Sequence, residues 1–131
     1  MKALSFWQPW AELVVIGAKK YETRSWNTNY RGPLLIHASR KFSKDDQELC
    51  RHWPFCEFVS VPHLLQRGAI IGSVDLVDCL NTNAWVTHDR VEQAFGNFSR
   101  GRFAWKLKNP VRFNKPIAAK GKLGIWEFRD E

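Results

Sequence analysis

The residues best suited to chemistry are concentrated between Gly17 and Lys41. Lys19, Glu22 and Arg24 follow one another at short intervals, and His37 comes later, within a short apolar run. A lysine or a histidine can act as a general base, and a carboxylate can assist it. An arginine beside them can hold a phosphate through its bidentate guanidinium. This stretch is therefore either a charged β-hairpin or the lining of a site.

The same residues also have ordinary structural explanations. Lys19 follows Gly17, where a helix is expected to end, and a lysine at such a place is usually solvated. Glu22 and Arg24 share one face of an alternating strand over residues 20–26, where a side-by-side ion pair is expected. A histidine in an apolar strand is more often a hydrogen-bonded structural residue than a catalyst. Both interpretations remain open at this point.

The clearest strand, predicted over residues 69–80, carries two further candidates. Ser73 and Asp75 project from one face of this strand. Asp75 needs either water or a partner, and a basic neighbour such as Lys19 or Arg24 would supply the partner. Gly72, in the same strand, predicts a bulge or the close approach of another backbone.

Positive charge is concentrated in two segments of a chain whose net charge is +7. Residues 19–44 hold seven Lys/Arg and one acid, and residues 93–126 hold eight Lys/Arg and no acid. If these segments fold together, they form a positive face suited to nucleic acid, although a solvated basic surface is the alternative. Seven tryptophans favour a single-stranded partner, because aromatic rings can stack on bases.

Composition and motifs narrow the class of protein. A chain of 131 residues has the size of one domain, so a single domain over residues 1–131 is expected. Apolar runs fall short of the ~20 residues of a membrane span, and the first residues do not resemble a signal peptide. Three cysteines favour free thiols in the cytoplasm. Cys50, His52 and Cys56 fit no zinc spacing, so neither a metal nor a cofactor is expected.

The periodicity predicts an α+β fold of short strands and short helices. Helices are expected from Pro9 to just before Gly17, from a cap at Ser43, and from a cap at Thr87 to Phe95. Strands are expected over residues 2–6, 20–26, 34–38, 69–80, 103–107 and 123–128, with a turn at residues 31–33. Without regular βαβ alternation, these elements favour a small mixed barrel over a parallel sheet.

Several motifs, in the same order, resemble the ASCH domain family, whose relatives are the PUA-like RNA-binding barrels. The matching stretches are LSFWQPWAELV (residues 4–14), GAKKYETRSW (17–26), YRGPLLIHASRK (30–41), GAIIGSVDLVDC (68–79), FAWKLKNPVRF (103–113) and KGKLGIWEF (120–128). The resemblance implies a PUA-like small β-barrel of about five to six strands with flanking helices. It also implies a cleft beside the QPWA helix.

In such a protein, the cleft would hold a nucleotide or a modified base of RNA or another single-stranded nucleic acid. The resemblance places Lys19, Glu22 and Arg24 in a basic, aromatic-lined cleft. The other residues expected to bind nucleic acid are Gln8, Trp10, Lys20, Trp26, Arg31, His37, Lys41, Asp75 and Trp105. Trp7 is a further candidate for the wall of the cleft.

Some relatives resemble enzymes, which leaves two alternatives to simple binding. One branch resembles an amidohydrolase of N4-acetylcytidine that uses a lysine, a threonine and a glutamate. Lys19 matches its lysine, but Glu22 stands where the threonine belongs, and Thr23 faces the opposite side of the strand. Other relatives resemble metal-independent ribonucleases. In either hydrolase Lys19 would be the general base, with Glu22 and Ser73 as further catalytic candidates and His37 a possible aid to proton transfer. A protein-interaction adaptor is the second alternative.

Overall fold

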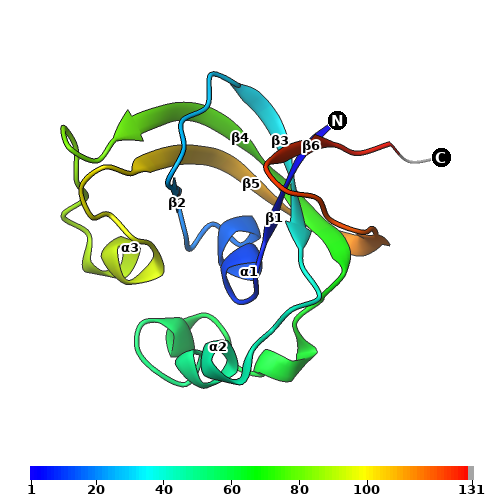
Figure 1. Ribbon diagram of the computed structural model, residues 1–131. Coiled ribbons are helices and arrows are strands. Elements are labelled where there is room, and N and C mark those ends of the chain that lie inside the picture. Colours follow the sequence, from blue (N-terminus) through cyan, green and yellow to red (C-terminus); the bar gives the residue numbers. More distant parts are fainter. Residues whose placement is uncertain (130–131) are drawn as a thin grey trace.

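The computed structural model describes residues 1–129 and shows a curled sheet of six strands (Figure 1). The order of the strands across the sheet is β2-β5-β4-β3-β1-β6. Strand β1 pairs with β3 in parallel, and the other neighbours are antiparallel. The strands are β1 (Lys2–Phe6), β2 (Tyr21–Arg24), β3 (Gly32–Ala38), β4 (Ala69–Asn81), β5 (Phe103–Ala118) and β6 (Ile125–Glu127). The sheet forms a half-barrel, as the sequence predicts.

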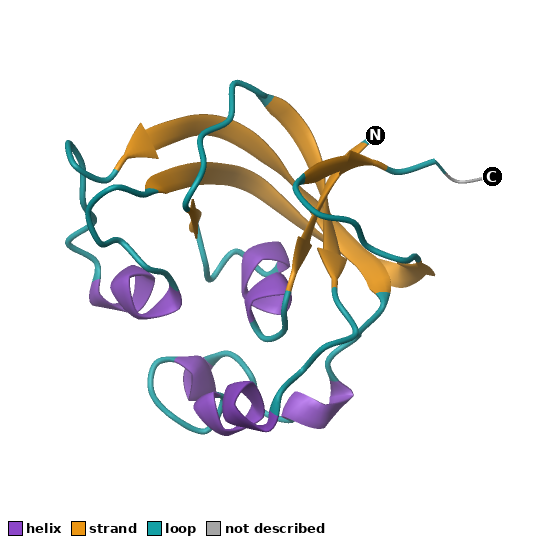
Figure 2. Ribbon diagram, viewed as in Figure 1, coloured by secondary structure: helices purple, strands orange, loops and turns teal. Residues whose placement is uncertain are grey.

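Within residues 1–129, three short helices accompany the sheet: α1 (Trp10–Val15), α2 (Lys44–Leu49) and α3 (Arg90–Phe95). Helix α1 lies in the hollow of the curl, and α2 and α3 lie on its open side (Figure 2). Single 3₁₀ turns follow α2 at Phe55–Glu57 and Pro62–Leu64. The predicted cap of α2 is confirmed, because Ser43 Oγ accepts a hydrogen bond of 3.0 Å from the Asp46 amide.

The main core lies between α1 and the concave face of the sheet. Val14 and Val15 of α1 are buried there against Leu76 of β4 and Trp105 of β5. A methyl group at Gly72 would lie 2.6 Å from Val15 Cγ1 and would also collide with the backbone of β5. The predicted close approach at Gly72 is therefore confirmed, since only glycine leaves room for both neighbours.

Several predicted boundaries are wrong for reasons of pairing and capping. Two of the three residues of the predicted turn at 31–33, Gly32 and Pro33, already belong to β3, because Gly32 pairs with Leu76 across the sheet. Helix α3 is capped by Asp89, and not by Thr87, since the Asp89 side chain accepts from the amides of residues 91 and 92. The strand expected over residues 103–107 continues to residue 118, because β5 pairs along the length of β4.

Candidate functional site

A large cavity lies where the ends of β1 and β2 meet the end of α3 and the connection between β5 and β6. Its volume is about 940 Å³, within the range of about 300–1,000 Å³ typical of ligand pockets. The lining comprises residues 5–7, 22–24, 94–97 and 119–124, together with Trp10, His37, Ser39, Arg40, Gly68 and Arg102. We call this cavity the main cavity.

The charged side chains of the main cavity are predominantly cationic. Of the lining residues that the structure describes, five are Lys or Arg, and Glu22 is the single acid. They come from both basic segments of the chain, which the pairing of β2 with β5 brings side by side. The five cations are Arg24, Arg40, Arg102, Lys120 and Lys122. An anionic ligand would therefore find mostly complementary charge here.

Lys19 lies behind the wall of the main cavity and does not line it. Its side chain is 1% exposed, and Nζ donates a hydrogen bond of 2.9 Å to the carbonyl oxygen of Phe95 at the end of α3. The same nitrogen lies 3.5 Å from Glu22 Oε1. The amine is thus engaged by two acceptors from different elements, which makes Lys19 a cross-link between α3 and the start of β2.

A second contact between the same elements involves Glu92 of α3. Its carboxylate accepts hydrogen bonds from the amides of Lys20 (2.6 Å) and Tyr21 (3.3 Å). Burial raises the pKa of the Glu92 carboxyl, and the Lys20 amide and the Lys19 amine oppose that rise. The contacts of Lys19 and Glu92 together are called the α3 clasp. The sequence analysis did not identify Glu92, whose position near a helix start is explained equally well by the helix dipole.

Arg24 occupies the wall itself. Its Nε donates to Glu22 Oε2 at 2.8 Å, and Nη2 donates to the Ser5 carbonyl oxygen at 3.0 Å. The guanidinium carbon also lies 5.3 Å from the centre of the Phe6 ring. Because a guanidinium has five N–H donors, Arg24 is held firmly and keeps donors for a ligand. Glu22 positions both Arg24 and Lys19, and is 9% exposed.

His37 and Ser5 form a hydrogen-bonded pair at another side of the main cavity. His37 Nε2 lies 2.8 Å from the Ala119 carbonyl oxygen, which can only accept, so the proton is assigned to Nε2. His37 Nδ1 then accepts from the Ser5 hydroxyl at 3.0 Å. Trp126 Nε1 donates to Ser5 Oγ at 3.2 Å. The pair therefore connects β1 and β3 with β6 and with the segment that precedes β6.

The expected aromatic residues divide between the cavity and the core. Trp7 lines the main cavity and is 52% exposed, with Lys41 Nζ 4.8 Å from the centre of its ring. Trp10 also lines the cavity and packs edge-on against Phe55. Trp105 is fully buried and packs against Trp26, whose carbonyl oxygen accepts from Trp105 Nε1. Trp105 thus belongs to the core, and the partly buried Trp26 packs against it.

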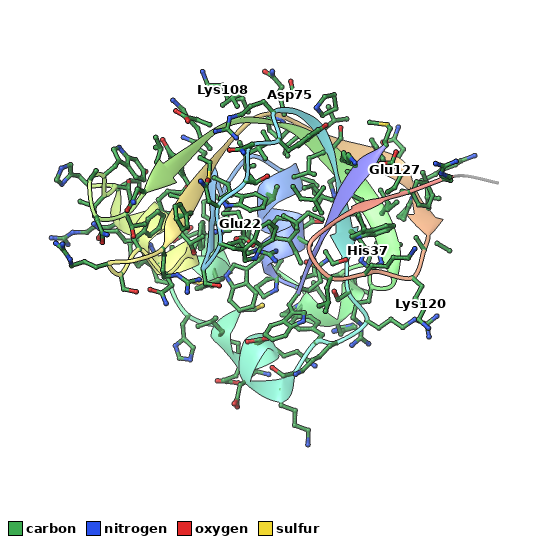
Figure 3. All side chains as sticks on the ribbon, turned by 45° about the horizontal axis from the view of Figure 1, so that its top comes forward. Glu22, His37, Asp75, Lys108, Lys120 and Glu127 are labelled. Atoms are coloured by element: carbon green, nitrogen blue, oxygen red, sulfur yellow. The ribbon has the colours of Figure 1, made fainter. Side chains whose placement is uncertain are left out.

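Ser73 and Asp75 lie apart from the main cavity. Figure 3 shows Asp75 beside Lys108 at the edge of the molecule, away from Glu22 and His37. Asp75 Oδ2 accepts from Asn109 Nδ2 at 2.8 Å, so the expected pairing with Lys19 or Arg24 is wrong. The reason is topological: β5 lies between β4 and β2 in the sheet.

The remaining candidates have separate positions. Gln8 is fully buried. Its Nε2 donates a hydrogen bond to the Gln66 carbonyl oxygen, and its Oε1 accepts one from the Glu12 backbone amide. Arg31 lies 3.8 Å from Asp78 on the surface, and Lys20 is exposed.

Thr23, expected to face away from the cleft, touches the main cavity. Its Oγ1 accepts from the Asn97 amide at 2.8 Å, because the chain after α3 covers the edge strand β2.

Sequence reasoning did not single out most of the lining, including the polar and cationic residues Ser5, Arg40, Arg102, Lys120 and Lys122. Arg40 and the two lysines lie in matched motifs, and Arg102 lies in the acid-free segment, so a signal was present. Within residues 1–129, no three His, Cys, Asp or Glu side chains are grouped as metal ligands. No helix in the described part of the chain has the length and apolar character needed to cross a membrane.

Residues 4–117 match the profile of the ASCH domain, so the chain belongs to the ASCH domain family. The chain is 33% identical to activating signal cointegrator 1 of Mus musculus and of Homo sapiens, over 95% of this chain. It spans only 22% of the length of those relatives. The fold is similar to that of the crystal structure of ASCH from Zymomonas mobilis, with a TM-score of 0.59 and 13% identity over 98% of this chain and 87% of that one. A point mutant of the same protein gives a TM-score of 0.58 and 14% identity, over 98% of this chain and 89% of the other.

Proposed function

We propose that this domain binds single-stranded RNA and holds one nucleotide, with a normal or modified base, in the main cavity. The carrying observation is the half-exposed Trp7 in a cavity that also holds five cationic side chains. Cations attract the phosphates, and an exposed ring provides a face on which a base can stack. The association of the ASCH domain family with RNA binding in general adds support.

In this proposal each part of the wall has a distinct task. The base stacks on Trp7, next to Lys41, whose amine stays near the backbone of the nucleic acid. Arg24, held by Glu22 and Ser5, directs its remaining donors at a phosphate or at the edge of the base. Lys19 acts as a positioning residue, because its buried amine already serves Phe95 and Glu22. The geometry therefore favours a binding role over general-base catalysis by Lys19.

Two tryptophans of similar exposure allow a controlled test of the stacking. Trp7 is 52% exposed in the cavity, and Trp53 is 59% exposed outside it. Fluorescence anisotropy with a fluorescein-labelled oligouridylate should give a Kd about 5- to 150-fold higher for Trp7→Ala, the cost of one stacked base. Trp53→Ala should bind like the wild type. Equal Kd values for both variants, or no binding by the wild type, would overturn the proposal.

A second experiment distinguishes a binding protein from an enzyme or an adaptor. Wild type and Lys19→Ala are incubated with short RNAs and with N4-acetylcytidine, and the products are identified by mass spectrometry. Unchanged substrates, together with salt-sensitive binding, support the proposed role. A product formed by folded wild type and lost with Lys19→Ala would instead identify a hydrolase. A complete lack of RNA affinity would leave the adaptor alternative.

A further inference from the structure

The connection between β5 and β6 borders the main cavity along its entire length. All six of its residues, Ala119–Gly124, line the cavity, and the segment is called the strap. Lys120, Lys122 and Leu123 are exposed, and Leu123 is 98% exposed. A single exposed leucine is ordinary on a protein surface. Here the leucine belongs to a cavity wall that also carries a lysine on either side of Gly121.

The first half of the strap is held against the Ser5–His37 pair. The Ala119 carbonyl oxygen accepts from His37 Nε2, and the Ala119 amide donates to the Gly68 carbonyl oxygen at 3.1 Å. A methyl group at Gly121 would lie 2.5 Å from Ser5 Oγ and 2.7 Å from His37 Cε1. The backbone of the strap therefore rests directly on the two side chains.

The second half of the strap is tied to the same place. After Gly124 the chain enters β6, where Ile125 pairs with Leu4 of β1. Trp126, the next residue, donates its Nε1–H to Ser5 Oγ at 3.2 Å. Both ends of the strap are thus tied to the Ser5–His37 pair, Ala119 through His37 and Trp126 through Ser5, and the arch between them is preorganised. A preorganised wall loses little conformational entropy when a ligand binds.

We propose that the strap is the second wall of the nucleic-acid site, a role that rests on the proposed function. Leu123 packs against the sugar and base of the nucleotide next to the one stacked on Trp7. Lys120 and Lys122 neutralise the flanking phosphates. A row of cations with an apolar side chain among them matches single-stranded nucleic acid, in which charged phosphates alternate with the apolar faces of the bases. Ser5 and His37 are the positioning residues that set the conformation of the strap.

Side-chain truncation tests the direct contacts, with controls from outside the main cavity. Leu123→Ala should raise the Kd for the labelled oligouridylate about tenfold, the effect of losing one buried leucine side chain. Leu64→Ala is the control, since Leu64 is 68% exposed and does not line the cavity. Lys122→Gln should reduce the slope of log K against log salt by about 0.7. Lys115→Gln, in β5 and outside the cavity, should leave that slope unchanged.

Gly121→Ala tests the positioning without removing a charge. Gly121 is not among the residues with a positive φ, so alanine is permitted by the backbone. Its methyl group must still push the strap away from Ser5 and His37. We expect a salt slope reduced by about 1.4, the sum for two lost phosphate contacts. Adding Lys120→Gln and Lys122→Gln to Gly121→Ala should then reduce the slope no further, a result that simple loss of stability would not produce.

The outcomes separate the strap from the proposed function. If the wild type shows no affinity, or Trp7→Ala has no effect, the proposed function itself fails. If Trp7→Ala weakens binding while the Leu123, Lys122 and Gly121 variants bind with wild-type Kd and salt slope, the strap inference is overturned and the RNA site remains. Weaker binding by Leu123→Ala, with a reduced salt slope for Lys122→Gln and Gly121→Ala, supports the strap.

Discussion

Replacing Lys19 by methionine removes the buried charge of the α3 clasp and keeps an unbranched side chain in its place. The Phe95 carbonyl oxygen loses its 2.9 Å donor, and the carboxylates of Glu22 and Glu92 lose their nearest buried cation. Removing one partner of a buried ion pair costs about 3–5 kcal/mol. That is a large part of the roughly 5–15 kcal/mol that stabilises a typical domain.

The assay is guanidinium unfolding followed by tryptophan fluorescence, with a thermal scan beside it. At about 3–5 °C per kcal/mol for a domain of this size, Lys19→Met should lower Tm by about 9–25 °C. Lys20→Met is the matched control, because Lys20 is the exposed neighbour and its loss should change the free energy of unfolding by about 0.5 kcal/mol or less.

A double variant checks the electrostatic part of this reasoning. Combining Lys19→Met with Glu92→Gln removes the amine and one of the carboxylates that it faces. The double variant should therefore lose less stability than the sum of the two single losses. If Lys19→Met unfolds at the same guanidinium concentration as Lys20→Met, the α3 clasp does not stabilise the fold. The interpretation of Lys19 as a general base would then be favoured again.

The burial of Glu92 and Cys50 and the close packing at Gly72 can each be tested by experiment. Because burial raises the pKa of the Glu92 carboxyl above its usual 4.5, the stability that this group contributes is present below pH 4.5 and is lost as pH rises through the raised pKa. The stability of Glu92→Gln relative to wild type, measured by denaturant titration, should therefore increase as pH rises from 4.5 through the raised pKa. A difference in free energy of unfolding that does not change with pH would contradict this. Burial raises the pKa of the Cys50 thiol to about 11. Iodoacetamide at neutral pH should therefore alkylate the exposed Cys56 much faster than Cys50, as measured by peptide mass spectrometry. Equal alkylation rates would argue against a buried Cys50. Gly72→Ala should destabilise the fold by about 1–3 kcal/mol in the same unfolding assay, because its methyl group has no room beside Val15.

Local signals in the sequence were sufficient for several features. The Ser43 cap and the mixture of short strands with short helices were predicted because they depend on a hydrogen bond or a periodicity within a few residues. The close approach at Gly72 was predicted from a glycine inside a strand pattern, although the atoms that crowd it belong to Val15 and Val111, which are distant in sequence. The motifs were also sufficient to identify the ASCH domain family. Boundaries were less predictable, because the pairing with β4 extends β5 far beyond its alternating apolar residues.

Which charged and aromatic residues share a cavity depends on the tertiary structure. Motifs and periodicity were enough to identify the family, the α+β class and a set of charged candidates near residue 19. They did not determine that Lys19 turns inward to Phe95, that Asp75 is separated from Arg24 by a strand, or that Trp7 is exposed while Trp105 is buried. These outcomes depend on the strand order and on contacts between residues distant in sequence, such as the 2.8 Å bond from His37 to residue 119. Periodicity reports only the face of an element, whereas burial depends on what packs against that face.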